Sequence, residues 1–510
     1  MKTVLITGAT SGIGFELAKL YAGQGDRLIL LGRRPLESLS DPLFTPERYC
    51  QVDLSSVDAH EATTEWLADQ QISKIDLVIH NAGLGWFGDP AEQSAVSIQE
   101  LVTVNLETPM RLTHKLLPLL RQASGKLVFV SSVATALATA DYTVYTATKT
   151  ALDGFARSLR IELAGEVDVQ VLHPGATRTP MHEKIGITRD RMDYEKFTPA
   201  SDVAAKMVSA IKGRGKNVAI GFGNKALRTV GRTFPNVLRG VMRKTNDGAG
   251  WPASQKSPHV VITGAADGIG RATALRFAQA GYQVTGIDFD PQRSAETEKA
   301  LRALGVEARF YTADLSDPEA IEQVVTQLGQ ESPIDVLISN AGISAAGYFA
   351  KMPLEQQMKV VAVNFTAPLL LTAALLRDKR LAQNSQLVFL SSLSKYVGYP
   401  GAAVYAATKD GLASYGASLH VDGRHPTSST VVYPGPTRTA HARRYSPDNS
   451  REETRTPPDA VAEAVFAGAT KRSFVVLPGG GAKMFAFLGR LAPGLMEQAM
   501  KKVILEKFDE

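Results

Sequence analysis

Cysteine and long apolar runs are nearly absent from this sequence. The 510 residues include a single cysteine, Cys50, so the chain cannot form an internal disulfide. We therefore expect a protein of the cytoplasm, or one indifferent to the redox state of its compartment. No stretch of about 18 consecutive apolar residues is found, and the segment Met1–Gly8 becomes glycine-rich after only a few apolar residues. The sequence thus predicts neither a membrane-spanning helix nor a secretory signal peptide.

An excess of charge of one sign is also small. The chain has 56 basic and 51 acidic residues, a formal net charge of +5. Nucleic-acid binding would require this excess to be gathered in one basic patch, so an ordinary mixed surface is favoured. Hydrophobic residues make up 44% and charged residues 21% of the chain, which is typical of a globular protein and excludes a mostly disordered one. No metal site is predicted.

The chain contains a long internal repeat. The loop Thr7–Gly14 (TGATSGIG) recurs 256 residues later as Thr263–Gly270 (TGAADGIG), and further motifs recur in the same order at offsets of up to 260 residues. Such a period indicates a duplicated domain and not the short unit of a solenoid. We predict a first domain at 1–245, a linker at 246–257 that is rich in Gly, Ser and Pro, and a second domain at 258–510.

Within each half, short apolar runs alternate with segments of helical periodicity. Residues 4–6, 28–31, 76–79 and 126–130 are continuous apolar runs, and residues 15–21 have helical spacing. Strands that are apolar on both faces, separated by helices, indicate a parallel sheet covered on both sides. The predicted fold class is α/β, with two Rossmann-like, doubly wound parallel-sheet domains in tandem.

A glycine-rich loop follows the first strand of each half and opens a helix. Glycines allow a tight turn and close approach to a pyrophosphate, whose charge the free N–H groups of the helix N-terminus bind. A single such loop could be a structural turn, but two copies in the same context favour dinucleotide binding. The candidate cofactor-binding residues are Gly8, Ser11, Gly12, Ile13 and Gly14 in the first half and Gly264, Asp267, Gly268, Ile269 and Gly270 in the second.

The end of the second strand differs between the halves. The first half has Arg33 and Arg34 there, whereas the second has Asp288. An arginine accommodates the 2′-phosphate of NADP(H), whereas a carboxylate binds the ribose hydroxyls of NAD(H) and repels that phosphate. We expect NADP(H) in the first domain and NAD(H) in the second, and the charge of Asp267 points the same way. Solvated surface charge is the alternative for the two arginines. Candidates near the adenine ring are Asp53 with Leu54 and Asp314 with Leu315.

A serine, a tyrosine and a lysine recur at fixed spacing. Tyr145 and Lys149 are four residues apart and so share one face of a helix, and Ser132 ends the preceding strand. A tyrosine phenol has a pKa near ~10. The lysine ammonium and the positive charge of an oxidised nicotinamide are expected to lower this pKa, which suits the tyrosine to acid–base catalysis. Ser132 can hydrogen-bond the reacting oxygen. The second half repeats the set as Ser392, Tyr405 and Lys409.

With these motifs the chain resembles two fused members of the short-chain dehydrogenase/reductase family, over nearly its whole length. The resemblance implies that the tyrosines are the general acid/base, that the lysines hold the nicotinamide ribose, and that Asn105 and Asn364 each hold a water that relays protons. It also implies cofactor contacts on the adenosine side by Asn81, Ala82, Gly83, Asn340, Ala341 and Gly342, and near the nicotinamide by Pro174, Gly175, Thr179, Pro434, Gly435 and Thr439. Neither half departs from the family pattern at a catalytic position.

The segments expected on the substrate side differ between the halves. In the family, the residues after the Pro-Gly-x-x-x-Thr motif form a lid over the substrate; here these are 181–187 and 440–446. Arg443 and Arg444 in the second lid could meet an anionic group, but solvated loop charge is the favoured interpretation. Each half ends in a basic amphipathic extension, 225–244 and 483–502. These could contact a membrane peripherally or cap an apolar pocket, although packing against the other half or another subunit is favoured.

The expected function is that of an NAD(P)(H)-dependent oxidoreductase with two active sites, each interconverting a carbonyl and a secondary alcohol on a lipophilic small molecule. The alternative is an epimerase or isomerase that oxidises an alcohol at the NAD site and reduces the ketone at the NADPH site. A cofactor-sensing binding protein is a third hypothesis, which the intact catalytic residues disfavour. We expect a cytoplasmic protein, with peripheral membrane contact as an alternative, that forms an intramolecular pseudo-dimer or a homo-oligomer and binds no nucleic acid.

Overall fold

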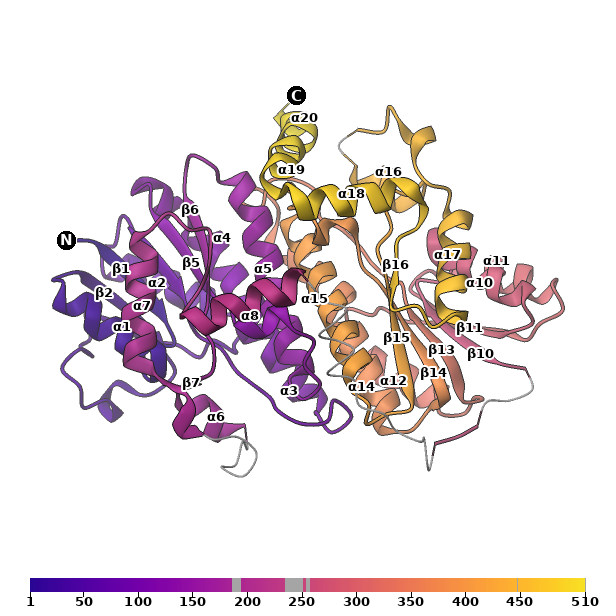
Figure 1. Cartoon of the computed structure of the whole chain (residues 1–510), viewed down its shortest axis with the longest axis horizontal. Helices are drawn as coiled ribbons and strands as arrows, with labels where there is room; N and C mark the ends of the chain where they lie inside the picture. The colour runs from indigo at the N-terminus through magenta and orange to yellow at the C-terminus, as the bar shows by residue number, and fades with distance from the viewer. Residues whose placement is uncertain (186–193, 234–250, 254–256, 447, 510) are drawn as a thin grey trace. The chain divides into compact units, whose positions relative to one another are not determined.

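The computed structural model describes residues 1–185, 194–233, 251–253, 257–446 and 448–509 (Figure 1). The chain divides into two compact units. The first consists of Met1–Phe87, Gln99–Leu137 and Val144–Arg239, and the second of Gly88–Ile98, Ala138–Thr143 and Gly240–Glu510. Most of the predicted linker 246–257 lies outside the described residues, so the predicted domain boundaries remain a prediction.

The first unit is built on a seven-stranded sheet with the order β3-β2-β1-β4-β5-β6-β9, in which all neighbours are parallel. The strands are β1 (Thr3–Thr7), β2 (Arg27–Gly32), β3 (Tyr49–Gln51), β4 (Leu77–His80), β5 (Lys126–Val130), β6 (Asp168–His173) and β9 (Asn217–Ala219). The strand order reverses between β1 and β4. In doubly wound sheets, ligands bind outside the carboxyl ends of the strands at such a switch point.

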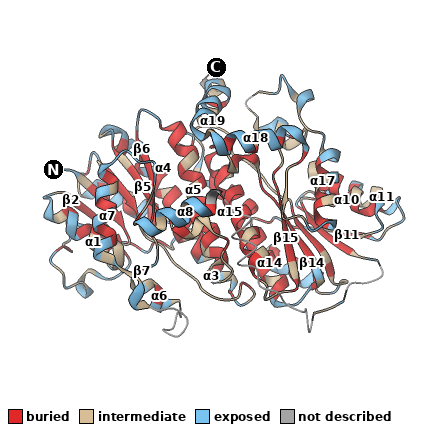
Figure 2. Cartoon of the chain, viewed as in Figure 1, coloured by how far each residue is buried: buried red, intermediate tan, exposed pale blue. Residues whose placement is uncertain are grey.

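Helices connect these strands and cover the sheet. They are α1 (Gly12–Gly23), α2 (Ala59–Asp69), α3 (Ala95–Val102), α4 (Thr108–Gln122), α5 (Thr143–Glu162), α6 (Pro180–Lys184), α7 (Ala200–Lys212) and α8 (Phe222–Thr233), with a short strand pair β7 (Thr177–Arg178) and β8 (Thr198–Pro199). Helices α1 and α7 pack on one face, where Leu17 and Met207 join Ile6 of β1 in one buried cluster. The strands are buried throughout their centres (Figure 2).

The second unit repeats this plan with the order β12-β11-β10-β13-β14-β15-β16, again fully parallel. Its strands are β10 (His259–Thr263), β11 (Gln283–Asp288), β12 (Ala308–Thr312), β13 (Ile334–Ser339), β14 (Leu381–Leu390), β15 (Thr427–Val432) and β16 (Val475–Val476). Its helices are α10 (Gly268–Gln279), α11 (Pro291–Arg302), α12 (Pro318–Leu328), α13 (Leu354–Val361), α14 (Ala367–Arg377), α15 (Ala403–Val421), α16 (Ala440–Tyr445), α17 (Pro458–Thr470), α18 (Gly479–Leu491), α19 (Pro493–Met500) and α20 (Glu506–Asp509). The prediction of two doubly wound α/β sheets is confirmed.

One helical segment is apolar over a longer stretch than the sequence prediction indicated. The segment Leu354–Arg377 is long and apolar enough to cross a membrane by length and composition, although the sequence scan predicted no such helix. It comprises α13, a π-helical turn and α14, and 78% of its most apolar window is buried inside the structure. This burial is that of a core helix packed against a sheet.

Matching aromatic pairs join the sheet to the long helix in both units. Phe129 on β5 lies edge-on to Phe155 on α5, with ring centroids 5.7 Å apart, and Phe389 on β14 lies edge-on to Tyr415 on α15 at the same distance. All four side chains are fully buried. Each pair fixes the helix that carries the predicted tyrosine and lysine against the strand that carries the predicted serine.

We predict that Phe129→Ala lowers the free energy of unfolding of the first unit by about 3–5 kcal/mol, because it opens a cavity between β5 and α5. Chemical denaturation followed by circular dichroism measures this change. Val57→Ala is the matched control, because that side chain is 57% exposed. A loss below about 1 kcal/mol, as for a surface substitution, would contradict this packing.

Candidate active sites

The glycine loop of each unit is shaped by the Asn-Ala-Gly segment of the neighbouring strand. Thr7 Oγ1 accepts hydrogen bonds from the backbone N–H groups of Asn81 and Ala82, both at 3.0 Å, and Asn81 Nδ2 donates to Thr7 O at 3.1 Å. A Cβ on Gly14 would fall against the carbonyl oxygen of Gly8 and 2.5 Å from Asn81 Nδ2. The Asn81 amide therefore supports the loop, and only glycine fits where the helix start passes beneath it.

The second unit builds the same loop with the same contacts. Asn340 Nδ2 donates to Thr263 O at 3.0 Å, and Ala341 N donates to Thr263 Oγ1 at 3.0 Å. Helices α1 and α10 begin at Gly12 and Gly268 and so present their free N–H groups at the loops. This cradle of small residues at a helix N-terminus fits the pyrophosphate of a dinucleotide.

Thr179 and Thr439, in the segments that follow β6 and β15, reach the glycine loops. A Cβ on Gly12 would lie 3.1 Å from Thr179, and one on Gly268 would lie 3.2 Å from Thr439. A Cβ on Gly175 would collide with Asn224 at the start of α8. The structure thus brings the Pro-Gly-x-x-x-Thr segment together with the loop, and the nicotinamide contact inferred from the resemblance stays a prediction.

The adenosine end of the first site carries the expected basic residues. Arg33 is exposed, and Arg34 Nη2 donates to Ser38 O at 3.0 Å. Asp53 Oδ1 accepts from the backbone N–H of Ser55 at 3.0 Å; this bond, together with the charge of Arg33, lowers the pKa of the Asp53 carboxyl. Arg33 and Asp53 therefore lie near each other at the carboxyl edge of the sheet.

The adenosine end of the second site is dominated by carboxylates. Asp288 is buried at the end of β11, where its Oδ2 accepts from Ala266 N at 2.9 Å. Asp267 Oδ1 accepts from the N–H of Gly268 at 2.7 Å, and its Oδ2 pairs with Arg293 at 3.1 Å. Arg293 comes from α11, and the sequence analysis missed it because α11 has only the short helix Leu36–Ser38 as its counterpart in the first half.

The two lysines occupy equivalent buried positions. Lys149 Nζ donates to Val130 O at 3.1 Å, and Lys409 Nζ donates to Leu390 O at 2.9 Å. Burial lowers the pKa of each lysine to about 8. A Cβ on Gly83 would lie 3.1 Å from Lys149 Nζ. A larger residue in place of the glycine of the Asn-Ala-Gly motif would therefore press on the ammonium and displace it by a few tenths of an ångström.

Each tyrosine is hydrogen-bonded to the serine that precedes it by thirteen residues. Burial raises the pKa of Tyr145, and the hydrogen bond with Ser132 partly offsets this rise. Burial and Tyr399 raise the pKa of Tyr405 to about 12, with Ser392 acting in the opposite sense. The protein's own groups thus shift both pKa values upward, whereas the sequence analysis expected a lowering by the lysine together with an oxidised nicotinamide.

Asn105 and Asn364 lie in π-helical turns, Thr103–Glu107 and Ala362–Thr366, that interrupt the long helices. Such turns are frequent at functional sites. Asn105 Oδ1 accepts from Leu84 N at 2.8 Å, and its Nδ2 donates to Leu84 O at 3.0 Å and to Thr148 Oγ1 at 3.1 Å. The side chain therefore holds the loop after Gly83 against α5. The water relay inferred from the resemblance stays a prediction.

A buried polar cluster behind the first site was not predicted. Asp153, one helical turn beyond Lys149, lies 3.0 Å from His173 Nε2 and 3.7 Å from Arg228 of α8, and it accepts from Thr135 Oγ1 at 3.0 Å. The corresponding positions in the second half are Ala413 and Tyr433, which belong to an apolar cluster with Leu393, Ala482 and Ala486. A polar cluster thus holds α8 in the first unit, and an apolar one holds α18 in the second.

A large cavity opens at the second site. It measures about 2190 Å³ and extends from Gly264 and Asp288 to Tyr405 and Lys409, which is ample for a dinucleotide and a small substrate. The C-terminal extension lines it through Phe485, Met500 and Ile504, among others, and Lys507 pairs with Asp448 across its rim. This extension caps the cavity of its own unit, the alternative that the sequence analysis did not favour. In the first extension, residues 234–244 lie outside the described residues.

Known proteins resemble this chain over both halves. A family model described as short chain dehydrogenase matches residues 2–190 and 258–450. The 1-deoxy-11-beta-hydroxypentalenate dehydrogenase of Streptomyces exfoliatus is 36% identical over 168 residues, which cover 32% of this chain and 61% of that protein. Dehydrogenase/reductase SDR family member 7B of Bos taurus is 30% identical over 258 residues, which cover 47% of this chain and 79% of that protein. The N-domain of a bacterial malonyl-CoA reductase with NADP aligns over 87% of this chain and 93% of that chain, with a TM-score of 0.61 and 16% identity, and shares the fold.

We predict that Asp153→Asn lowers the free energy of unfolding of the first unit by about 2 kcal/mol at neutral pH, because Arg228 and His173 lose a partly buried anionic partner. Burial alone would raise the pKa of Asp153, but His173, Arg228 and hydrogen bonds from nearby hydroxyls outweigh it and hold the pKa well below its usual range. The charge of Asp153 also acts on Lys149, whose pKa it raises against the effect of burial.

The sign of the pH dependence follows from this lowered pKa. The contribution of the ionised Asp153 is complete above the pKa of about 4 that aspartate has in an unfolded chain, and it is lost as the pH falls further, through the lower value of the folded state. Denaturant titrations of wild type and Asp153→Asn should therefore differ at pH 7 and converge in acid, whereas the exposed control Asp202→Asn should match wild type throughout. A difference independent of pH would contradict the ion-pair account.

Proposed function

The chain belongs to the short-chain dehydrogenase family and is an oxidoreductase that acts on CH–OH groups with a nicotinamide cofactor; from this premise we propose that both halves are active sites. The observation that carries the proposal is the duplicated set of serine, tyrosine, lysine and asparagine. The lysine donates to the end of the serine-bearing strand at 3.1 Å in one unit and at 2.9 Å in the other. In each unit the asparagine holds the loop that follows the Asn-Ala-Gly segment. A degenerate second copy would have no reason to retain these contacts.

The bound nicotinamide supplies or accepts the hydride, and the residues of the chain manage the proton. In reduction the neutral phenol of Tyr145 or Tyr405 gives its proton to the carbonyl oxygen, which the neighbouring serine hydroxyl also hydrogen-bonds. In oxidation the same tyrosine must take the alcohol proton as a phenolate. Because burial raises the pKa of both tyrosines, the ammonium of Lys149 or Lys409 is needed nearby to stabilise the phenolate.

The proposed cofactors are NADP(H) in the first unit and NAD(H) in the second. Exposed Arg33 and Arg34 at the end of β2 suit a 2′-phosphate. At the end of β11, Asp288, Asp267 and Asp290 line the cavity with a single guanidinium, that of Arg293, which pairs with two of these carboxylates. The net charge there is negative, which disfavours a 2′-phosphate.

A lipophilic substrate is proposed for the first site. A Cβ on Gly85 would lie 3.4 Å from Ile185 and 3.6 Å from the sulfur of Met181, so the lid packs apolar side chains onto the loop that carries Trp86 and Phe87. The opposite charges at the ends of β2 and β11 favour, as a second candidate, an epimerase that couples oxidation with NAD to reduction with NADPH. The two functions differ in whether both sites accept the same carbonyl compound.

The location and partners of the protein are part of this proposal. We infer a cytoplasmic enzyme with a small-molecule substrate that works as a pseudo-dimer of its two units or as a homo-oligomer. Peripheral membrane contact is supported by exposed apolar side chains on α18 and α19, namely Met484, Phe487, Leu491 and Leu495. The basic residues Lys501 and Lys502 come directly after α19 and would favour an anionic surface.

Replacing the catalytic tyrosines tests the number of active sites. We predict that Tyr145→Phe abolishes NADPH-linked turnover and retains NADH-linked turnover, that Tyr405→Phe does the reverse, and that the double variant loses at least about 100-fold in both. Steady-state assays over a panel of ketones and secondary alcohols with each cofactor measure this. Turnover by the double variant at the wild-type rate would overturn the assignment.

Replacing the two arginines tests the cofactor of the first site. In a Tyr405→Phe background, Arg33→Gln with Arg34→Gln should raise KM for NADPH about 10- to 100-fold, because two charge-assisted contacts to the 2′-phosphate are lost. KM for NADH should change little. Arg214→Gln, which removes an exposed arginine of the first unit, is the matched control. An unchanged KM for NADPH would mean that these arginines are solvated surface charges.

A further inference from the structure

The walls on the substrate side of the two sites differ in chemistry. Counting from Thr179 and Thr439, the apolar Met181 and Ile185 of the first lid are replaced by His441 and Tyr445 in the second. Residue Phe197, which precedes the short β8 strand, is replaced by Arg455, which precedes the matching bridge at Thr456. The lid of the second site is thus polar and basic at the positions where that of the first is apolar.

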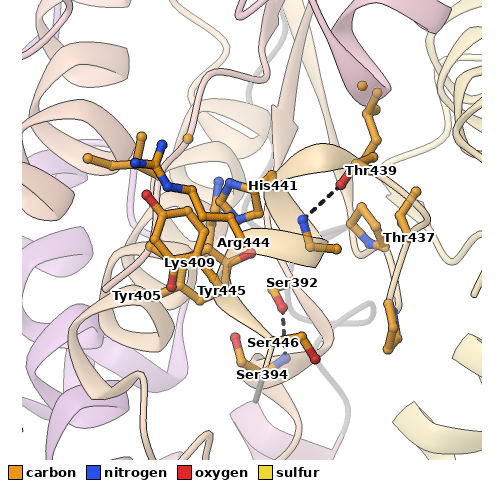
Figure 3. Close-up of a pocket in the computed structure, with 18 of the residues that line it drawn as sticks. Ser392, Ser394, Tyr405, Lys409, Thr437, Thr439, His441, Arg444, Tyr445 and Ser446 are labelled. Atoms are coloured by element: carbon orange, nitrogen blue, oxygen red, sulfur yellow. Dashed lines mark hydrogen bonds between the residues drawn. The ribbon is translucent and has the colours of Figure 1, made fainter. Parts of the chain in front are cut away.

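Arg444 is a cation on the wall of the second cavity. It lines the cavity, and its guanidinium carbon lies 5.7 Å from the ring centre of Tyr445 (Figure 3). Within the described residues it makes no ion pair, whereas its neighbour Arg443 lies outside the cavity lining and pairs with Glu452 at 2.7 Å. The sequence alone does not distinguish the two arginines, but in the structure α16 places only Arg444 in the cavity lining.

Arg455 adds a second cationic group to the same wall. Its Nη2 donates to Ser446 Oγ at 3.0 Å and to Asp448 O at 2.9 Å, which fixes the side chain. Its Nη1 is buried without a hydrogen-bond partner. Buried polar atoms nearly always have a partner, so this guanidinium keeps one unused donor beside the cavity, available to an acceptor on a ligand.

Both arginines lie close to the reacting end of the cavity. The charge of Arg455 acts on Tyr399, whose ring centre is 6.5 Å from that of Tyr405. His441 has its ring centre 6.4 Å from that of Tyr405, and burial, Lys409 and Arg444 lower the pKa of His441 to about 4. The imidazole is therefore neutral at pH 7 and offers a hydrogen bond without adding charge.

The carboxylates of the cavity do not neutralise these arginines. Asp267, Asp288, Asp290 and Asp314 line the opposite end, at the glycine loop and the ends of β11 and β12. At the end near the lid, Asp448 is paired with Lys507, and Glu506 is exposed on the C-terminal helix. The cavity is thus negative where adenosine would lie and positive beyond Tyr405.

We propose that the second active site takes a carbonyl or alcohol substrate that carries an anionic group, a carboxylate or a phosphate, received by Arg444 and Arg455. The inference rests on the proposed function of that site and names its substrate class. The reaction is unchanged: the carbonyl carbon gains a hydride from the reduced nicotinamide, which is thereby oxidised, and the carbonyl oxygen gains a proton from Tyr405. Since the matching lid positions of the first site are apolar, the proposal gives the two sites different substrates, which counts against the epimerase.

The direct test is binding to the NADH-loaded full-length chain by isothermal titration. Hexanoate is compared with hexanamide, its neutral counterpart, and inorganic phosphate forms a separate arm that distinguishes the two anions. We expect one of the anions to bind at least about tenfold more tightly than hexanamide. Arg444→Gln should remove this advantage, whereas Arg443→Gln should leave it intact, because that arginine pairs with Glu452 outside the cavity.

Turnover gives the second readout. With Tyr145→Phe silencing the first site, medium-chain oxo acids should be reduced with NADH at a higher kcat/KM than their methyl esters. Arg444→Gln should raise KM for the acids about 10- to 100-fold while changing kcat and the KM for the esters little. Equal binding and turnover of acids and neutral probes, or a rise only in KM for NADH, would overturn the proposal.

Failure of the proposed substrate class and failure of the proposed second active site give different results. The Tyr405→Phe chain keeps both arginines, so it should still bind the anion through Arg444 even though its second site is catalytically silent. Anion binding that depends on Arg444, combined with no NADH-linked turnover of any probe by the Tyr145→Phe chain, would contradict the second active site alone. Turnover of neutral probes without anion preference would contradict the substrate class alone.

Discussion

Each unit depends on a buried ammonium held at the carboxyl edge of a parallel sheet. Lys149 and Lys409 donate to the last carbonyl groups of the strands before their helices, which compensates in part for the cost of burying a charge. The glycine of the Asn-Ala-Gly motif leaves room for the ammonium, which lies close against it. The asparagine in the π-helical turn fixes the loop that carries this glycine, and the same Asn-Ala-Gly segment holds the nucleotide-binding loop through Thr7 or Thr263. The lysine, the asparagine, the glycine loop and the tyrosine are therefore held in place by one connected set of contacts.

The two units share these contacts and the aromatic pair behind them, and they differ at several positions nearby. The charge at the end of the second strand changes sign, from Arg33 and Arg34 to Asp288. The lid changes from apolar to basic, and the cluster behind the lysine changes from Asp153 and His173 to Ala413 and Tyr433. These changes fall at the end of the second strand, in the segment expected to form the lid, and beside the helices α8 and α18. On the function proposed above, the two units share one chemistry of hydride and proton transfer and differ in how they recognise both reactants.

The sequence predicted the parts of this account that are local or duplicated. These parts are the strands, the glycine loops, the four-residue spacing of tyrosine and lysine, and the sign of the charge after the second strand. They could be predicted because each depends on neighbours along the chain or occurs twice. The contacts of Asp153 with His173 and Arg228 could not be predicted, because they join α5 to β6 and to α8, segments that meet only in the folded unit. Arg293 and Arg455 were missed for a related reason: each lies in a segment whose counterpart in the first half differs. The relay water at Asn105 comes from the resemblance alone and stays a prediction, whereas the contacts of this side chain with a loop backbone and with Thr148 emerge only from the fold.

The central claim is that one chain holds two complete nicotinamide sites of opposite preference. Equilibrium titration of the full-length chain, followed by cofactor fluorescence and by competition between NADPH and NADH, tests it most directly. The account predicts two cofactor molecules bound per chain, with NADPH the stronger competitor at one site and NADH at the other. A single bound cofactor per chain, or two sites with the same preference, would contradict it.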